Sequence, residues 1–143
     1  LGHRIAVLAA VELGDALRDA TQGRAGSDAL AAAAATMRDY VKAHPGRYTA
    51  GNRVSPSGPE DPLTIASGRM LAPLAAVLHG YGLDPGQDVH ALRMLRSALH
   101  GFATLEVEGG FRFDTDVDES FAWTVGLLDR ALLASRRGTM AGC

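Results

Sequence analysis

Residues 87–108 of this chain read QDVHALRMLRSALHGFATLEVE, and this stretch decides the fold class. At steps of three or four residues, one side of the stretch carries Leu92, Leu95, Leu99, Phe102 and Glu106. That spacing is typical of one face of an α-helix. Further apolar residues lie beside this face, namely Met94, Ala98 and Leu105. We therefore predict a helix over 87–108 that packs against other elements on more than one side.

The rest of the chain also predicts helices. Apolar residues recur at helical spacing over 3–21, 28–43, 62–81 and 116–134, and a short helix is predicted over 45–50. Candidate N-caps precede three of these stretches, at Ser27, Asp61 and Asp116. Pro73 lies inside the 62–81 stretch, where it is expected to kink or split the helix.

These elements add up to an all-α fold. We predict a single helical-bundle domain over 1–135 with five long helices and one short helix, followed by a flexible tail over 136–143. Three glycines, Gly68, Gly101 and Gly126, fall inside helices, where glycine costs about 1 kcal/mol relative to alanine. Close packing between helices is the interpretation we favour for them, and room for a ligand is the alternative.

Composition excludes several classes of protein. Alanine dominates and isoleucine occurs only at Ile5 and Ile65, which disfavours β-sandwiches and β-barrels. The formal net charge is −2, so the chain is not expected to bind DNA by itself. Cys143 is the single cysteine, which excludes an intrachain disulfide and favours a reducing, cytoplasmic setting. No apolar run reaches membrane-spanning length, and we expect no membrane partner.

The motifs that mark common catalytic and metal sites are missing. The five histidines form no His-Glu-x-x-His pattern, and neither a Gly-x-Ser-x-Gly elbow nor a phosphate-binding glycine loop occurs. We therefore predict no metal site, no cofactor and no enzymatic activity. Glu106 is the most unusual polar residue, because it lies in a largely apolar helix. Either it faces solvent or it has a partner, for which Arg96 and His100 are the candidates.

Several short motifs together resemble a known family. They are His-Pro-Gly-Arg-Tyr at 44–48, Ala-Leu-His-Gly-Phe-Ala-Thr-Leu-Glu at 98–106, Gly-Gly-Phe at 109–111 and Val-Asp-Glu-Ser-Phe at 117–121. In this order they resemble the C-terminal regulatory domain of bacterial TetR-family transcriptional repressors, in the subgroup named for a Trp-His-Gly motif. Leu99 stands here where that motif has tryptophan.

The resemblance implies a regulatory function in which DNA binding and effector binding belong to different domains. Members of the family bind DNA through an N-terminal helix-turn-helix, which this chain does not supply. The resemblance therefore implies that the DNA-binding part was removed, lost or never present, and a start at Leu1 rather than methionine fits removal. The regulatory domains form homodimers through their last two long helices and bind small hydrophobic effectors between helices.

Two groups of residues follow as expectations. For the dimer interface we predict Leu95, Leu99, Phe102, Leu105, Glu106, Phe121, Val125 and Leu128. For the ligand pocket we predict Tyr40, Tyr48, Met70, Leu74, Met94 and Trp123. Members of the two groups can exchange places, since each helix has two apolar faces. The alternative is a helical dimerisation or interaction module with no small-molecule ligand. A packed interior around Met70 and Met94 would favour this alternative.

Overall fold

The computed structural model describes residues 1–137, and the part of the predicted tail at 138–143 lies outside them. The helices are α1 (Gly2–Thr21), α2 (Gly26–Ala43), α3 (Pro45–Asn52), α4 (Pro62–His79), α5 (Asp88–Val107) and α6 (Val117–Ala134), with a 3₁₀ turn η1 at Pro85–Gln87. Within residues 1–137 the structure contains no strand. The predicted all-α fold, with five long helices and one short helix, is confirmed.

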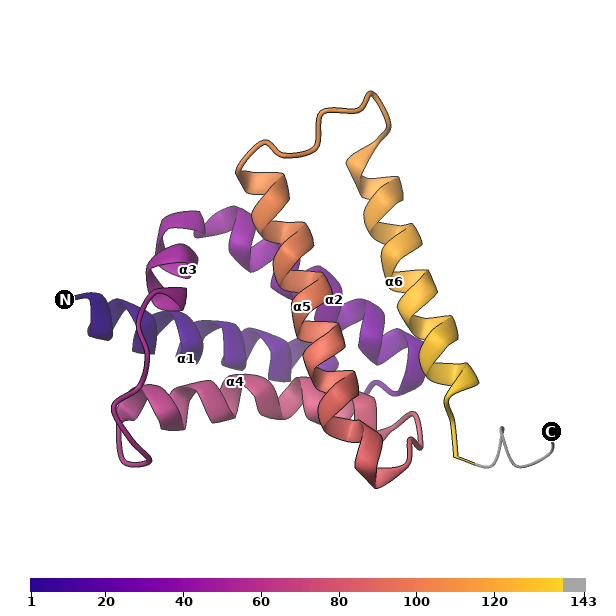
Figure 1. Ribbon diagram of the computed structural model, residues 1–143, viewed down its shortest axis with the longest axis horizontal. Helices are drawn as coiled ribbons and strands as arrows, with labels where there is room; N and C mark the ends of the chain where they lie inside the picture. The colour runs from indigo at the N-terminus through magenta and orange to yellow at the C-terminus, as the bar shows by residue number, and fades with distance from the viewer. Residues whose placement is uncertain (138–143) are drawn as a thin grey trace.

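Helices α1 and α4 lie side by side, and α5 crosses them at a steep angle (Figure 1). Helix α1 packs mainly on α4 and also contacts α2 and α3, while α5 packs mainly on α2. Helices α5 and α6 are joined by the segment 108–116, and α6 rests mostly on α2 rather than on α5. The side chains that are fully buried include Leu13, Leu17, Leu30, Leu74, Tyr81, Leu95 and Leu99. Tyr48 of α3 and Phe121, Leu128 and Leu132 of α6 belong to the same core, so all six helices contribute to it.

Two of the three predicted N-caps are confirmed. The carboxylate of Asp61 accepts a hydrogen bond from the backbone of Leu63 at 2.8 Å, and that of Asp116 accepts from Asp118 at 3.1 Å. The Ser27 cap is wrong, because α2 begins earlier, after the extended Ala25. The Ser27 hydroxyl instead donates to Asp129 of α6 at 2.8 Å. Pro73 does not split α4, which continues through it.

Helices α1 and α4 approach each other closely at Gly14, which is not one of the three glycines considered above. A Cβ on Gly14 would come within 3.1 Å of the Met70 Cα, so this glycine lets α1 approach the backbone of α4. At Gly68 and Gly101, by contrast, a Cβ would meet nothing within 4 Å, and at Gly126 it would meet only the Arg130 side chain. Close packing inside this chain is therefore the wrong explanation for those three glycines.

A nearly buried arginine ties α2 to α5 and α6. Arg38 donates two hydrogen bonds to Glu106, at 2.8 and 2.7 Å, and its guanidinium also pairs with Asp118 at 2.7 Å. The same group lies 4.8 Å from the centre of the Phe121 ring. These bonds raise the pKa of Arg38 and hold the pKa of Glu106 below its usual value. Of the two alternatives for Glu106, the structure shows the paired one, and the partner is Arg38 rather than Arg96 or His100.

Candidate functional site

A cavity of about 180 Å³ lies where α1, α3, α4 and α5 meet. Small residues of α1, among them Ala6, Ala9 and Ala10, leave space on one wall. Helix α4, which packs beside α1, supplies larger apolar side chains, including Met70 and Leu74. The short alanine side chains leave space that the neighbouring elements do not fill. Most of the side chains that line it are apolar, while polar and apolar atoms contribute similar shares of its exposed surface, so the cavity suits a small ligand with an apolar body and a polar group.

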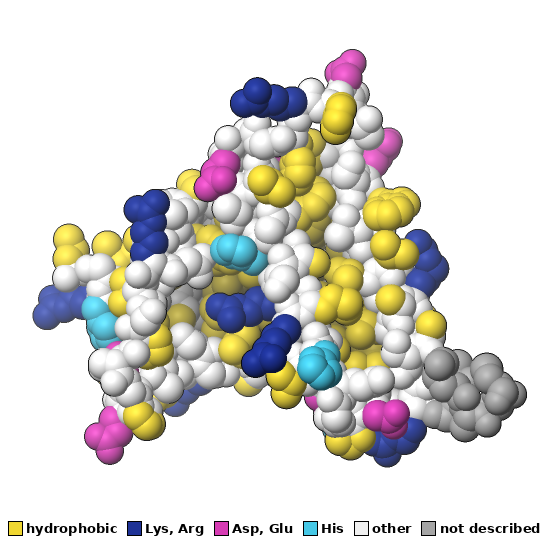
Figure 2. Space-filling view, in the orientation of Figure 1, with side chains coloured by type: hydrophobic (Ala, Val, Ile, Leu, Met, Phe, Trp, Pro, Cys, Tyr) yellow, Lys and Arg dark blue, Asp and Glu magenta, His cyan; other side chains and the backbone are white. Residues whose placement is uncertain are grey.

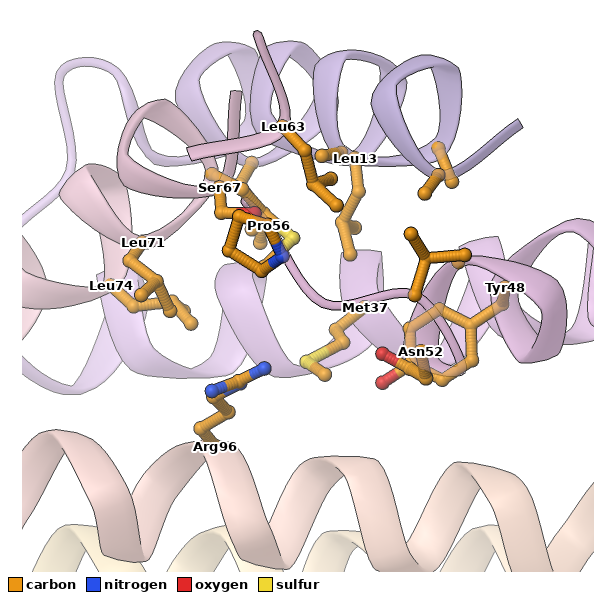
Figure 3. Close-up of a pocket in the computed structure, with 17 residues that line it drawn as sticks. Leu13, Met37, Tyr48, Asn52, Pro56, Leu63, Ser67, Leu71, Leu74 and Arg96 are labelled. Atoms are coloured by element: carbon orange, nitrogen blue, oxygen red, sulfur yellow. The ribbon is translucent and has the colours of Figure 1, made fainter. Parts of the chain in front are cut away.

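Four polar side chains line the cavity: Tyr48, Asn52, Ser67 and Arg96. Figure 3 shows Arg96 extending from α5 with its guanidinium directed toward this space, beside Met37. Tyr48 is buried, and its hydroxyl lies 2.6 Å from Nδ1 of His100 in a hydrogen bond between α3 and α5. Burial raises the pKa of Tyr48, although Asn52 and Arg96 act in the opposite direction. The phenol is therefore neutral at physiological pH.

The structure brings together half of the residues predicted for the pocket. Tyr48, Met70 and Leu74 line the cavity, whereas Tyr40, Met94 and Trp123 do not. Tyr40 turns away toward Glu12, to which its hydroxyl donates at 3.0 Å. Met94 is 39% exposed and Trp123 is 65% exposed, so both lie on the outer surface.

Sequence reasoning missed several lining residues. Arg96 was predicted only as a candidate partner for Glu106, and neither Asn52 nor Met37 was predicted to line the pocket. The alanines of α1 carried a usable signal, because Ala6, Ala9 and Ala10 share a helical face with Leu13 and Leu17. A face of small residues that continues into a face of large ones leaves room at the small end.

The residues predicted for the dimer interface are mostly inside this chain. Leu95, Leu99, Phe121 and Leu128 belong to the buried core, and Phe102 packs on the rings of Phe111 and Phe121. Val125 is half-buried against the same core, and Glu106 bonds to Arg38. Of the eight, Leu105 alone is exposed, at 48%. The residues that α5 and α6 expose therefore differ from those predicted for the dimer interface.

That outer surface is apolar. Figure 2 shows hydrophobic side chains over α5 and α6 and in the space between them. We define the exposed face of α5 and α6 as Met94, Gly101, Leu105, Trp123, Gly126, Leu127 and Leu133. Its two glycines have open space above them, because only an arginine side chain comes near either one. Exposed apolar surface of this extent is typical of an interaction site.

The described residues contain neither a metal-binding cluster nor a membrane-spanning helix. Within residues 1–137, no three histidine, cysteine or acidic side chains are grouped as ligands for a metal ion. None of the described helices is both long and apolar enough to cross a bilayer.

Comparison with known proteins identifies the family. The domain described as "Tetracyclin repressor-like, C-terminal domain" matches residues 30–128, more than half of the chain. An uncharacterized HTH-type transcriptional regulator of Mycobacterium tuberculosis, Rv0681, is 39% identical over 84% of the chain. A second such regulator, YobS of Bacillus subtilis, is 28% identical over 95%. The match spans 54% of the first relative and 70% of the second, so the chain corresponds to about half the length of the first.

Proposed function

Because this chain belongs to the family of tetracycline-repressor-like C-terminal domains, we propose that it is the effector-binding and dimerisation domain of a TetR-like transcriptional regulator. DNA is then read by a helix-turn-helix segment that this chain does not carry, as the printed names of the relatives suggest. The regulator works in the cytoplasm as a homodimer and responds to a small hydrophobic effector.

The cavity is the observation that carries this proposal. Its volume of about 180 Å³ can be compared with an engineered apolar cavity of about 150 Å³ that binds benzene. Met70 packs against the core and also lines this cavity, whereas Met94 lies on the outer surface. The alternative of a module without a small-molecule ligand called for a packed interior there, so the cavity disfavours that alternative.

The position of α1 suggests how binding reaches the DNA-binding part. This helix lines the cavity along Ala6–Leu17 and rests on α4 at Gly14. At its first turn, His3 Nε2 donates to Asp61 Oδ1 at 2.6 Å, which fixes α1 to the start of α4. A ligand that contacts both α1 and α4 favours one arrangement of the two helices over another. Such a difference in affinity between two arrangements is what an effector needs in order to shift their populations.

The exposed face of α5 and α6 supports the dimer. Its glycines, Gly101 and Gly126, have the open space that a close approach by a partner's helices needs. The interface we propose is therefore Met94, Leu105, Trp123, Leu127 and Leu133 with these two glycines. Met94 and Trp123 move to this group from the predicted pocket, while the ligand site keeps Tyr48, Met70 and Leu74.

Two measurements test the proposal. Light scattering should give about twice the chain mass of 14.9 kDa at micromolar concentration, and a clean monomer contradicts the dimer. A thermal-shift screen of small apolar compounds should then raise the unfolding temperature of the wild type.

A pair of substitutions shows whether those compounds enter the cavity. Ser67→Phe places a ring in the cavity and should abolish the shift, whereas Ile65→Phe places the same ring at an exposed position of α4 and should preserve it. Shifts that survive Ser67→Phe refute the assignment of the cavity as the ligand site.

A further inference from the structure

We propose that the effector is a carboxylate on a compact apolar body, and that Arg96 binds its charged end. This inference rests on the proposed function and narrows the chemical class of the ligand in the same cavity. In this proposal the apolar side chains of the cavity contact the apolar part of the ligand, and Arg96 selects for its carboxylate.

Arg96 differs from the arginines that stabilise the fold. Arg38, Arg47 and Arg137 each pair with a carboxylate at 3.2 Å or less. Within residues 1–137, no carboxylate lies within ion-pairing distance of Arg96. Its guanidinium is nevertheless directed at the cavity rather than away from it (Figure 3). A guanidinium presents a planar set of donors that matches the two oxygens of a carboxylate.

The surroundings of Arg96 also favour an anion. In Figure 2 the hollow where α3 and α5 meet α1 and α4 carries basic and histidine side chains, and no acidic side chain lies within it on this face. Asn52 and Ser67 line the same cavity, so the polar groups that face the ligand are either cationic or neutral. No protein charge near the ligand would therefore compete for Arg96 or repel an anion.

The volume limits the size of the apolar body. A space of about 180 Å³ accommodates one six-membered ring or a short alkyl chain, by comparison with the benzene-binding cavity of about 150 Å³. The ligand class is therefore an arylacetate or a short-chain fatty acid rather than a long lipid. Its tail contacts Met70 and Leu74, and its carboxylate reaches Arg96.

The test compares carboxylates with neutral compounds of the same shape. Phenylacetate is paired with phenylacetamide and hexanoate with hexanamide, and each is titrated calorimetrically into the full chain at low ionic strength. The carboxylate should bind about tenfold more tightly than its amide, since a hydrogen bond to a charged group is worth more than one to a neutral group. Added salt should weaken only the carboxylate.

Variants of α5 connect that preference to one side chain. Arg96→Gln should weaken the carboxylate about tenfold and leave the amide unchanged, and Arg96→Lys should retain part of the preference. Arg93 is exposed on the same helix, as Arg96 is, but it does not line the cavity, so Arg93→Gln should have no effect beyond salt-dependent screening. Circular dichroism checks that each variant is folded.

The outcomes separate this inference from the proposed function. Equal binding of acid and amide, or a preference that survives Arg96→Gln, overturns the carboxylate inference. Binding of neither pair overturns it as well. In each case the proposed function still stands if a neutral apolar compound stabilises the wild type but not Ser67→Phe, and it falls if no compound does so.

Discussion

Replacing Glu106 by glutamine tests how strongly the Arg38 cluster holds α5 and α6 to α2. The Glu106 side chain is 15% exposed and accepts two hydrogen bonds from a guanidinium that is itself 12% exposed. Glutamine has the same shape but keeps one acceptor, and its amide hydrogens would face the donors of Arg38. Hydrogen bonds to charged groups contribute about 1.5–3 kcal/mol each, and Asp118 remains to neutralise Arg38 in part. We expect Glu106→Gln to lower the free energy of unfolding by about 2 kcal/mol.

The assay is urea unfolding followed by far-ultraviolet circular dichroism, at one fixed protein concentration because a dimer gains stability with concentration. Glu108→Gln is the matched control, since Glu108 is exposed at the end of the same helix and should change stability by less than about 0.5 kcal/mol. The reasoning is refuted if the two variants lose the same stability.

The pH dependence provides a second readout of the same pair. The hydrogen bonds from Arg38 lower the pKa of Glu106 in the folded chain below its ordinary value of 4.5. A carboxylate of this kind stabilises the fold fully above its unfolded pKa, and the contribution is lost as pH falls through the folded pKa. The difference between wild type and Glu106→Gln should therefore be constant near neutral pH and shrink below pH 4.5. A difference that grows as the solution is acidified contradicts this assignment.

Three further predictions concern glycines and one buried hydroxyl. Gly14→Val should destabilise the fold by about 2 kcal/mol, because α1 must then move away from α4. Gly68→Ala, at a position with open space, should be neutral or stabilise the fold by up to about 1 kcal/mol. Equal effects of the two substitutions in thermal unfolding would contradict the close contact at Gly14. Gly101→Arg and Gly126→Arg should reduce the dimer fraction measured by analytical ultracentrifugation, while Leu8→Ser, a change at an exposed position of α1, should not. Tyr81→Phe removes a hydroxyl that donates to Asp129 at 2.6 Å, so it should cost about 1 kcal/mol in urea unfolding, and a silent change argues against that bond.

The helices were predictable because their signals are local. Periodic leucines, a capping carboxylate at Asp61 or Asp116 and the turn residues between helices act within a few positions of one another. Ser27 shows where local reasoning ends, because its hydroxyl has a partner 102 positions away on α6. A side chain can cap its own helix or bond to a distant one, and the sequence near it does not distinguish the two.

The site was less predictable because it depends on which face of a helix turns inward. Helix α5 is apolar on two faces, and the core received Leu95 and Leu99 while Met94 and Leu105 remained outside. The choice is made by contacts with α2 and α4, which are distant in sequence. Arg38 gave no local signal as the partner of Glu106, since 68 positions separate them. The same holds for Arg96, whose role appears only once α1 and α4 are placed opposite α5.

The most direct test of the account is a crystal structure of the chain grown with a compound that stabilises it in the thermal-shift screen. We predict density for the compound in the cavity beside α1 and α4, in contact with Met70 and Leu74 and with its polar end toward Arg96. Density on the exposed face of α5 and α6 instead, with the cavity unfilled, would contradict the claim that this cavity is the effector site.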